Sequence, residues 1–304
     1  METDMGFLTH AMVDLIGIMP ESLIWRFARR YIAGSTLSDG LAEATELLNG
    51  GYATTLDVLG EDISQDREAD QALENYRRLV EALSEKDLIR NISLKLSQFG
   101  LKLNANAMES RIFSLVDWAR EHDCFVRIDM EDSSTTTRTI DLYRTIRKRY
   151  DRVGTVIQAC LRRSIDDVAT LQKEGATNLR ICKGIYIEDS SIAYRDYQEV
   201  RDNYMKLVRQ MFDGGSFIGL ATHDDWLIDQ CLLEIRRRGF ASDRYEFQML
   251  LGVGEHLRKD LIREGHCVRV YIPFGEAWKA YSLRRFRENP KIAWYVIKNL
   301  LRFA

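Results

Sequence analysis

The chain has 304 residues, of which 45% are hydrophobic, and its formal net charge at pH 7 is -3. This length allows two average domains or one large α/β barrel, because such barrels typically need about 250 residues. The small net charge and the lack of Lys/Arg tracts give no extended cationic surface, so DNA and RNA are not expected partners.

The N-terminal segment is expected to be a helical appendage rather than a targeting signal. Residues 1–5 are acidic, and the apolar residues from Met12 to Trp25 form an amphipathic pattern. We interpret this pattern as a packing face, with contact at a membrane surface as the alternative. No apolar run reaches the length of a membrane span, so a cytoplasmic protein is expected. The predicted division is an appendage over residues 1–50 and a barrel over residues 51–304.

From residue 52 onward, short apolar or β-branched runs alternate with longer amphipathic stretches. The predicted strands are Tyr52–Val58, Asn91–Leu96, Phe125–Met130, Gly154–Ala159, Asn178–Cys182, Phe217–Ala221, Glu246–Leu250 and Cys267–Ile272. The predicted helices are Asp70–Ser84, Glu109–His122, Thr136–Lys148, Ser164–Lys173, Tyr194–Met211, Asp225–Arg238, Leu257–Arg263 and, after Pro290, Lys291–Leu301. Strands alternating with helices indicate parallel βαβ units. Eight units without a Pro- or Ser-rich linker favour one closed α/β barrel of the TIM type, (β/α)8, over an open sheet.

In such barrels the active site lies at the carboxyl ends of the strands, and this sequence places many polar residues there. They are Asp57, Glu61, Lys95, Arg127, Asp129, Glu131, Gln158, Arg180, Lys183, Tyr186, Thr222, His223, Asp224 and Tyr271. A charged residue within an apolar strand is costly unless it is paired or used. This makes four of them candidates for function, with structural ion pairs as the alternative: Lys95, Asp129, Arg180 and Lys183.

The residue types at the predicted strand ends allow lysine chemistry but give no support for a metal site or a Rossmann nucleotide site. Lys95 or Lys183 can form a Schiff base, as in aldolases, or supply a fixed cation beside an anion. No metal site is expected, because the five histidines form no HxH pair. No Walker or strand-borne GxGxxG motif supports a Rossmann site. The five widely spaced cysteines are expected to be buried thiols in a reducing compartment.

The stretch that follows the eighth predicted strand carries two adjacent arginines. Residues Tyr281, Arg284, Arg285 and Glu288 recur at spacings of three, four and seven, so on a helix they share one broad face. Paired guanidinium groups suit a carboxylate and a glutamate suits an ammonium, while Tyr271 and Tyr281 supply an apolar wall. This face is a candidate pocket for a small zwitterion, and a solvated helix face with internal ion pairs is the alternative.

Taken in order, the segments at the strand ends resemble proline dehydrogenase, a family of flavin-dependent (β/α)8 barrels. The segments are Leu59-Gly60-Glu61, Ser93-Leu94-Lys95, Arg127-Ile128-Asp129, Ile157-Gln158-Ala159, Arg180 to Tyr186, Ala221 to Asp224, Phe247 to Gly252 and Tyr271 to Glu288. The resemblance covers about residues 51–288, and the chain is similar in length to the short monofunctional bacterial members. An ordered set of eight such segments is more specific than any single motif.

The resemblance implies a site for FAD and one for L-proline at the carboxyl ends of the strands. The implied FAD site, with Arg180 near the reactive flavin nitrogen, is formed by Asp129, Gln158, Arg180, Lys183, Gly184, Thr222, His223 and Glu288. The implied catalytic residues are Lys95, Asp129, Arg180, Tyr271, Tyr281, Arg284, Arg285 and Glu288. The implied proline site is formed by Lys95, Tyr186, Leu250, Tyr271, Tyr281, Arg284 and Arg285, with Glu61 as a gate that pairs with Arg284.

The reaction implied by the resemblance is oxidation of L-proline to Δ1-pyrroline-5-carboxylate by hydride transfer to FAD, the first step of proline catabolism. A quinone would reoxidise FAD, with peripheral contact of the protein at the inner face of the cell membrane. No extension suggests a fused second enzyme, so a separate pyrroline-5-carboxylate dehydrogenase would take the product. The alternatives are another barrel flavoenzyme such as a folate reductase, a lysine-dependent aldolase and a non-catalytic amino-acid-binding barrel.

The sequence departs from the family pattern at Ile185, where Ala is frequent, and at Ile187, where an aromatic residue is usual. The segment Glu276–Ala280 is shorter than in the long bifunctional members. Tyr271, in place of a small hydroxyl residue, favours proline over hydroxyproline as the substrate.

Overall fold

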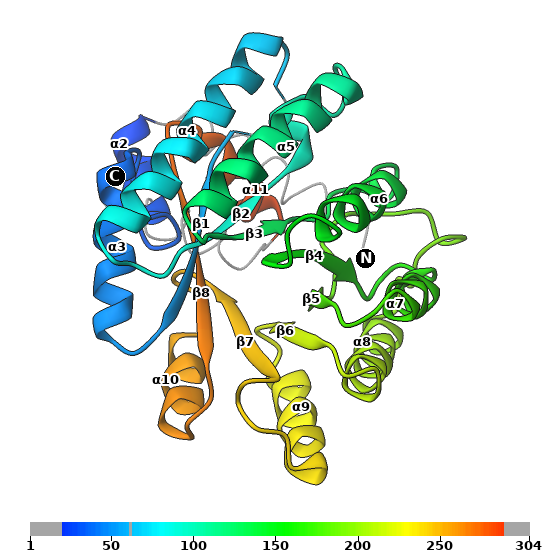
Figure 1. Ribbon diagram of the computed structural model, residues 1–304. Helices are drawn as coiled ribbons and strands as arrows, with labels where there is room; N and C mark the ends of the chain where they lie inside the picture. The colour runs from blue at the N-terminus through cyan, green and yellow to red at the C-terminus, as the bar shows by residue number, and fades with distance from the viewer. Residues whose placement is uncertain (1–19, 61–62, 289–304) are drawn as a thin grey trace, which may run out of the picture.

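Eight parallel strands form a closed barrel in the computed structural model, which describes residues 20–60 and 63–288, without the side chains of Leu23 and of residues 284–288. The strands pair in chain order, and the last closes on the first (Figure 1). They are β1 (Ala53–Val58), β2 (Asn91–Leu94), β3 (Phe125–Ile128), β4 (Val153–Gln158), β5 (Asn178–Cys182), β6 (Phe217–Ala221), β7 (Tyr245–Leu250) and β8 (Val268–Phe274). The predicted TIM-type barrel and its eight strands are therefore confirmed.

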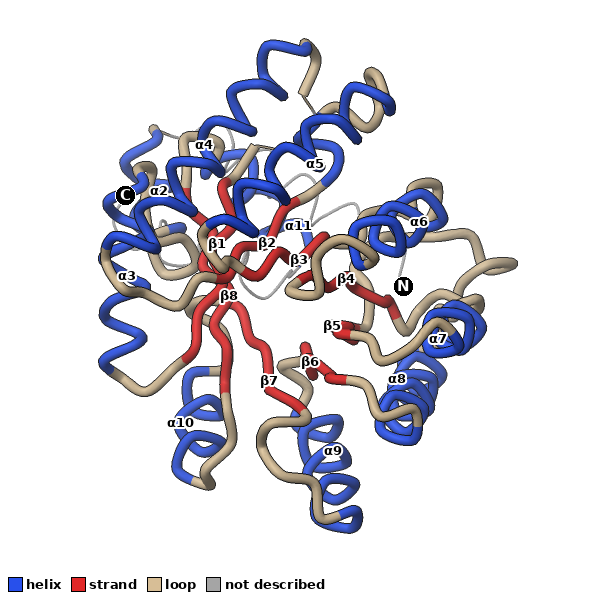
Figure 2. The backbone as a smooth tube through the Cα atoms, in the orientation of Figure 1, coloured by secondary structure: helices blue, strands red, loops and turns tan. Residues whose placement is uncertain are grey.

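Helices surround the strands, as the blue and red segments of Figure 2 show. They are α2 (Glu21–Ala28), α3 (Leu37–Asn49), α4 (Asp66–Glu85), α5 (Ala105–Glu121), α6 (Thr136–Arg147), α7 (Ser164–Lys173), α8 (Tyr197–Asp213), α9 (Asp225–Arg238), α10 (Glu255–Arg263) and α11 (Trp278–Glu288), with a short 3-10 helix, η1 (Leu96–Phe99). Helices α4 and α5 begin four residues before the predicted starts. Their N-terminal caps, Gln65 and Asn104, lie ahead of the amphipathic pattern from which the starts were predicted.

The outer faces of the strands pack against the helices, whereas the inside of the barrel is polar. Hydrogen bonds join strands that are not neighbours, from Arg180 on β5 to Ser93 on β2, and from Tyr271 on β8 to Asp129, the residue after β3. Such bonds must cross the interior of the barrel. Gly154 on β4 makes room there, because a Cβ atom at this position would lie 2.2 Å from Nη1 of Arg127. The interior of the barrel is therefore filled by hydrogen-bonded polar and charged side chains.

The N-terminal helices pack onto the barrel and onto its last helix. Trp25 of α2 lies edge-on to Trp278 of α11, with 4.9 Å between the ring centroids. Ala28, Ile32 and Tyr281 are buried in one small cluster at this contact. In the view of Figure 1, α11 lies behind the strands. The described part of the amphipathic N-terminal pattern thus has a packing face, as we expected.

Three further expectations concern membrane spans, cysteines and the C-terminus. No helix among the described residues is both long and apolar enough to cross a membrane. All five cysteines are free thiols, and Cys124, Cys160 and Cys231 are buried. The predicted helix Lys291–Leu301 lies outside the described residues.

Candidate active site

A cavity of about 410 Å³ opens at the carboxyl ends of the strands. Every predicted site residue whose side chain is described lines it: Lys95, Asp129, Gln158, Arg180, Lys183, Gly184, Tyr186, Thr222, His223, Leu250, Tyr271 and Tyr281. They come from seven of the eight strand ends and from α11, and only barrel closure brings them together. The walls between the polar groups are largely apolar, from residues such as Met130, Val156 and Met249.

Lys95 follows β2 and is held as a fixed cation at one side of the cavity. Its Nζ donates to Oδ2 of Asp57 at 2.9 Å and to the hydroxyl of Tyr271 at 3.2 Å, and it lies 4.0 Å from Oδ2 of Asp129. Burial alone would lower the pKa of Lys95, but the charges of Asp57 and Asp129 outweigh it and the pKa is raised. Lys95 is therefore an ammonium ion at neutral pH. Lys95 and Asp129, both expected in the site, are therefore in contact.

Arg180 lies across the interior of the barrel with each part of its guanidinium group bonded. Nη1 donates to Oδ1 of Asp129 at 2.7 Å, Nη2 donates to Oγ of Ser93 at 3.1 Å, and Nε donates to Oε1 of Gln248. Gln248 in turn donates through Nε2 to Glu246 at 2.6 Å, which fixes the direction of the amide. Because these three partners come from or directly after three different strands, they hold the guanidinium group of Arg180 in one orientation.

Tyr271 lies between the two cations. Its hydroxyl donates to Oδ2 of Asp129 at 2.9 Å, while the ring centroid is 5.8 Å from Nζ of Lys95 and 5.4 Å from Cζ of Arg180. Burial, followed by the charge of Asp129, raises the pKa of Tyr271 well above its ordinary value. The phenol is therefore neutral at neutral pH, and its ring presents an apolar surface bordered by positive charge.

The far side of the cavity carries a second charged cluster around Asp224. Its carboxylate accepts hydrogen bonds from Lys183 at 3.1 Å, from Arg201 at 2.7 and 3.0 Å and from Tyr197 at 2.6 Å. Burial acts to raise the pKa of Asp224, but these hydrogen bonds hold the pKa well below its usual range. The cluster carries one net positive charge. Sequence reasoning missed Tyr197 and Arg201, although their spacing of four residues on α8 places both on the face toward Asp224.

Three more predicted residues of the cavity are held in place by their surroundings. Nε2 of Gln158 donates to the carbonyl of Glu131 at 2.8 Å. Gly184 has φ +97°, and a Cβ atom there would lie 2.3 Å from Sγ of Cys160, so only glycine fits. Nε2 of His223 accepts from the N–H of Leu250 at 2.9 Å. Burial, and then the charge of Lys183, lowers the pKa of His223 to about 4.

The two isoleucines that depart from the family pattern have different positions. Ile185 lines the cavity and is half-exposed, whereas Ile187 is 95% exposed and does not line it. Only Ile185 can alter the shape of the cavity.

One residue expected at the carboxyl ends lies elsewhere. Arg127 donates from Nη1 to the carbonyls of Thr155 and Asn178, both at 2.9 Å, and from Nη2 to Oδ1 of Asn178 at 2.6 Å. Asn178 is the first residue of β5, so the guanidinium reaches the amino ends of the strands. The placement of Arg127 at the active-site end was wrong, because a long inward side chain can turn toward either end of a barrel.

The structure does not describe the side chains of four predicted site residues. Arg284, Arg285 and Glu288 lie on α11, and their side chains are outside the described part of the structure, as is Glu61 entirely. The preceding residues of α11 are described, and Tyr281 on this helix lines the cavity.

The geometry disfavours a Schiff base at either lysine. A lysine nucleophile must lose its proton, which requires a lowered pKa. The pKa of Lys95 is raised instead, and the ammonium of Lys183 is bonded to Asp224. Both lysines are therefore better suited to act as fixed cations.

Comparison with known proteins gives a consistent set of matches. The sequence matches a family model described as Proline dehydrogenase over residues 41–296. It is 33% identical over 275 residues to proline dehydrogenase 1 of Bacillus subtilis (strain 168), covering 90% of this chain and 91% of that protein. It is 34% identical over 284 residues to proline dehydrogenase of Deinococcus radiodurans, covering 92% of this chain and 91% of that protein.

Longer proteins match over only part of their length. The bifunctional protein PutA of Escherichia coli (strain K12) is 26% identical, and the match covers 93% of this chain but 25% of that protein. The crystal structure of proline utilization A (PutA) from Bdellovibrio bacteriovorus inactivated by N-propargylglycine aligns with a TM-score of 0.80 at 23% identity, over 86% of this chain and 32% of that one. The chain thus spans about a third of that structure, and the alignment shows a shared fold.

Proposed function

The chain belongs to the proline dehydrogenase family, and from this premise we propose that it oxidises L-proline to Δ1-pyrroline-5-carboxylate by hydride transfer to FAD. One observation carries the proposal. Lys95, Asp129, Arg180 and Tyr271 meet in a single cavity with largely apolar walls. Fixed cations beside an apolar surface suit the carboxylate of an amino acid that is bound against a flat ring.

The residues present fit a flavin. The cavity has the size of typical ligand sites, about 300–1,000 Å³, with apolar walls for the faces of the ring. Gln158 and Arg180 provide hydrogen-bonding groups at one edge, and the net positive cluster of Lys183, Arg201 and Asp224 suits a phosphate. Bound FAD would accept the hydride from the substrate carbon. Asp129, which lines the same cavity, orients Arg180 for this contact.

The substrate carboxylate is proposed to bind Lys95 together with Arg284 and Arg285, with Glu288 and the gate Glu61 completing the site. Asp57 and Asp129 keep the ammonium of Lys95 in one place, so the carboxylate meets a preorganised charge. Tyr271, Tyr281, Leu250 and Tyr186 would surround the pyrrolidine ring and exclude water. Holding the substrate in one orientation lowers the entropic part of the barrier.

Arg180 is proposed to stabilise negative charge on the reduced ring rather than to transfer a proton. Its guanidinium is fixed by Asp129, Ser93 and Gln248, so it needs no reorganisation when charge develops. Tyr271 uses its hydroxyl within the protein, which leaves no polar group of this residue for a ring hydroxyl. Proline is therefore favoured over hydroxyproline.

Electrons are proposed to leave through a quinone, with the protein in peripheral contact with the inner face of the cell membrane. The product would pass to a separate pyrroline-5-carboxylate dehydrogenase.

The visible spectrum of the purified protein tests the cofactor, and anaerobic addition of L-proline tests the reaction. We expect flavin absorbance near its usual visible bands and bleaching on addition of proline. Trapping of substrate on Lys95 or Lys183 by borohydride would favour an aldolase instead. A colourless protein that cannot be reconstituted with FAD would refute the flavin assignment.

Arg284→Lys tests the carboxylate site separately. The ammonium of lysine cannot make the two parallel hydrogen bonds of a planar guanidinium group. The substitution should therefore raise the proline concentration for half-maximal bleaching about tenfold, while the amount of bound flavin stays unchanged. An unchanged concentration would show that this arginine does not contact the substrate.

A further inference from the structure

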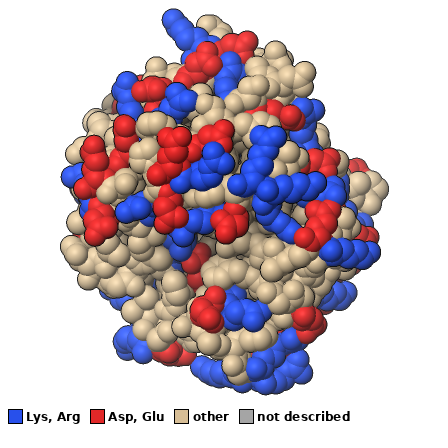
Figure 3. Space-filling view, in the orientation of Figure 1, with Lys and Arg blue, Asp and Glu red and all other residues tan. Residues whose placement is uncertain are grey.

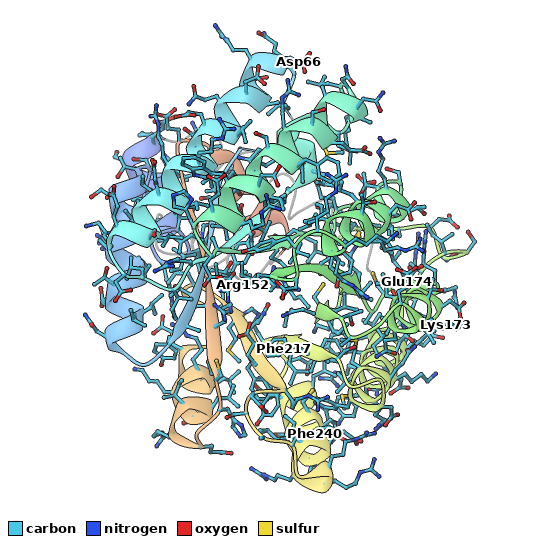
Figure 4. The ribbon with its side chains drawn as sticks, viewed as in Figure 1. Asp66, Arg152, Lys173, Glu174, Phe217 and Phe240 are labelled. Atoms are coloured by element: carbon cyan, nitrogen blue, oxygen red, sulfur yellow. The ribbon has the colours of Figure 1, made fainter. Side chains whose placement is uncertain are left out.

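A second cavity, of about 400 Å³, lies at the opposite end of the barrel. Its lining includes Arg90 and Asn91 before and at the start of β2, Phe125 at the start of β3, Arg152 before β4, and Arg269 near the start of β8. We call this cavity the amino-end basin. Arg152 is labelled in Figure 4, where it lies over the middle of the barrel. We propose that the amino-end basin binds a small phosphate-bearing anion.

The first argument is an excess of buried positive charge beneath the basin. Arg127 stacks on Phe125, a lining residue, with 4.9 Å from Cζ to the ring centroid. It is 2% exposed, and its hydrogen bonds within the described residues go to carbonyl and amide oxygens of Thr155 and Asn178, not to a carboxylate. A buried charge without an opposite charge is costly. Burial, and then repulsion from Arg180, lowers the pKa of Arg127 to about 9, which still leaves it charged at neutral pH.

The neighbouring carboxylate of Glu246 attracts Arg127 but compensates its charge only in part, because the same carboxylate also serves Arg269. Glu246 is buried and bonded in two places to Arg269, at 2.7 and 2.9 Å. Arg269 uses its remaining nitrogen on the carbonyl of Thr54 at 2.7 Å. The interior at this end therefore holds Arg127 and Arg269 against Glu246 alone, a net charge of one positive unit.

Two aspartates near the amino-end basin, Asp87 and Asp123, form only weak ion pairs with its arginines. Asp87 lies 3.9 Å from Arg90, with its side chain 99% exposed, and Asp123 lies 3.0 Å from Arg152, with its side chain 68% exposed. Exposed ion pairs of this kind contribute little to stability, because solvent screens both charges. A phosphate group with two charges can replace both partners, because guanidinium groups bind phosphate through paired hydrogen bonds.

The same two aspartates have an unusual backbone. Among the described residues, Asp87 and Asp123 are the non-glycine residues with positive φ, at 52° and 50°. Each follows the C-terminal cap of a helix, α4 or α5, where glycine is the usual residue. Glycine at position 123 would keep this backbone without strain and remove one competing carboxylate. The rim thus offers a substitution that tests the site without endangering the fold.

The charge excess belongs to the basin and not to the whole face. Figure 3 shows positive and negative side chains intermixed over the visible surface, with no broad field of one sign. An anion would therefore be drawn to the concave place where Arg90, Arg152 and Arg269 approach from three segments, and not to the surface at large.

The test is a titration of the full chain with inorganic phosphate at constant ionic strength, followed by calorimetry, with chloride as the reference anion. We expect saturable binding in the unsubstituted protein, an apparent Kd at least fivefold weaker in Arg152→Gln, and one about threefold tighter in Asp123→Gly. Arg120→Gln is the matched control, because Arg120 also pairs with an exposed aspartate on the surface, at 3.3 Å, and should bind phosphate as the unsubstituted protein does.

The readout requires neither proline nor flavin, so it is independent of the proposed function. The proposal is overturned if phosphate gives no saturable heat beyond chloride, if the two basin variants bind it equally, or if Arg120→Gln loses affinity as much as Arg152→Gln. Should Arg152→Gln fail to fold, the increase in affinity in Asp123→Gly decides the matter alone.

Discussion

Asp57 is fully buried and keeps Lys95 in place, so these two residues depend on each other. Lys95→Met would leave the carboxylate without its cation and should lower the free energy of unfolding by about 3–5 kcal/mol. Adding Asp57→Asn removes the unpaired charge and should restore part of that loss. Denaturant unfolding measures both variants. If the double variant is no more stable than Lys95→Met, the pair does not carry the stability assigned to it.

Restored stability need not restore function. In the double variant the proposed contact for the substrate carboxylate is still missing, so anaerobic bleaching by proline should stay at least a hundredfold slower than in the unsubstituted protein. Recovery of bleaching along with stability would show that Lys95 acts only through the fold.

Because of His223, the free energy of unfolding should decrease as the pH falls. Its pKa in the folded protein, about 4, lies below the ordinary value of 6.5 because the ring is buried, with Lys183 as a second cause. The unfolded chain therefore binds the proton first as pH falls. The contribution of His223 is complete above pH 6.5 and is lost between pH 6.5 and about 4, on the order of 3 kcal/mol.

His223→Gln isolates this contribution, since a glutamine oxygen can still accept from the N–H of Leu250. Unfolding curves at several pH values should show that the variant loses less stability than the unsubstituted protein between pH 6.5 and 4.5. Parallel curves for the two proteins would mean that His223 titrates normally.

At the scale of single residues, the sequence predicted which polar groups meet but not how they are held. Lys95, Asp129 and Arg180 could be selected because charges are rare in apolar strands. The roles of Asp57 and Gln248 could not, since their partners lie on other strands and are close only after the barrel has closed. Arg127 shows the limit of the rule, because the pattern fixes the inward face but not the end toward which a long side chain turns.

At the scale of elements, β4 carries a glycine at its second position because Arg127 crosses the same space. A Cβ atom on Gly154 would lie 2.2 Å from Arg127 and 2.6 Å from the backbone carbonyl of Asn178, which cannot move without shifting β5. Gly154→Ala should therefore lower the free energy of unfolding by about 2–4 kcal/mol.

Gly51→Ala gives the comparison for this substitution. That residue has φ +81°, but no atom lies within 4 Å of the place that a Cβ atom would take, so alanine there meets backbone strain without crowding. Its cost should be about 1 kcal/mol, measured by the same unfolding experiment. A larger loss at position 51 than at position 154 would contradict the crowding explanation.

Element types followed from the sequence better than element ends. All eight strands have their predicted place, because runs buried on the outer face are apolar and β-branched. Their ends differ by up to two residues. Lys95 and Asp129, predicted within strands, lie directly after β2 and β3, although the N–H of Asp129 still donates to the carbonyl of Leu94 on β2 at 2.8 Å. Which side chains face the cavity therefore follows from the observed pairing of the strands and could not be read from the sequence.

At the scale of the molecule, the N-terminal helices support the helix that carries the predicted arginine pair. Trp25→Ala removes the contact of α2 with Trp278 on α11. We expect a local loss of about 2 kcal/mol, because a partly buried aromatic side chain is deleted. The proline concentration for half-maximal bleaching should rise about fivefold, since Arg284 and Arg285 lie on α11.

Trp118→Ala is the matched control for this prediction. Trp118 on α5 is also partly buried and donates to the carbonyl of Arg77, away from α11. Its loss should lower stability without changing the proline concentration for half-maximal bleaching. An equal change in both variants would mean that α11 does not depend on α2. The division at residue 50 stays a prediction, and the packing of α2 on α11 makes the two parts interdependent.

The pairing of β1 with β8 decides when this protein can become functional during its synthesis. Six residue pairs join these strands, from Ala53 with Arg269 to Val58 with Phe274. Lys95 contacts both Asp57 on β1 and Tyr271 on β8 beside that seam, and Lys95 and Tyr271 are 176 positions apart in the chain. A ribosome must therefore release nearly the whole barrel before the cavity exists, and until then the open edges of β1 and its neighbours are exposed to wrong pairing. Slow folding and dependence on chaperones are the expected consequences of a site built across the closure.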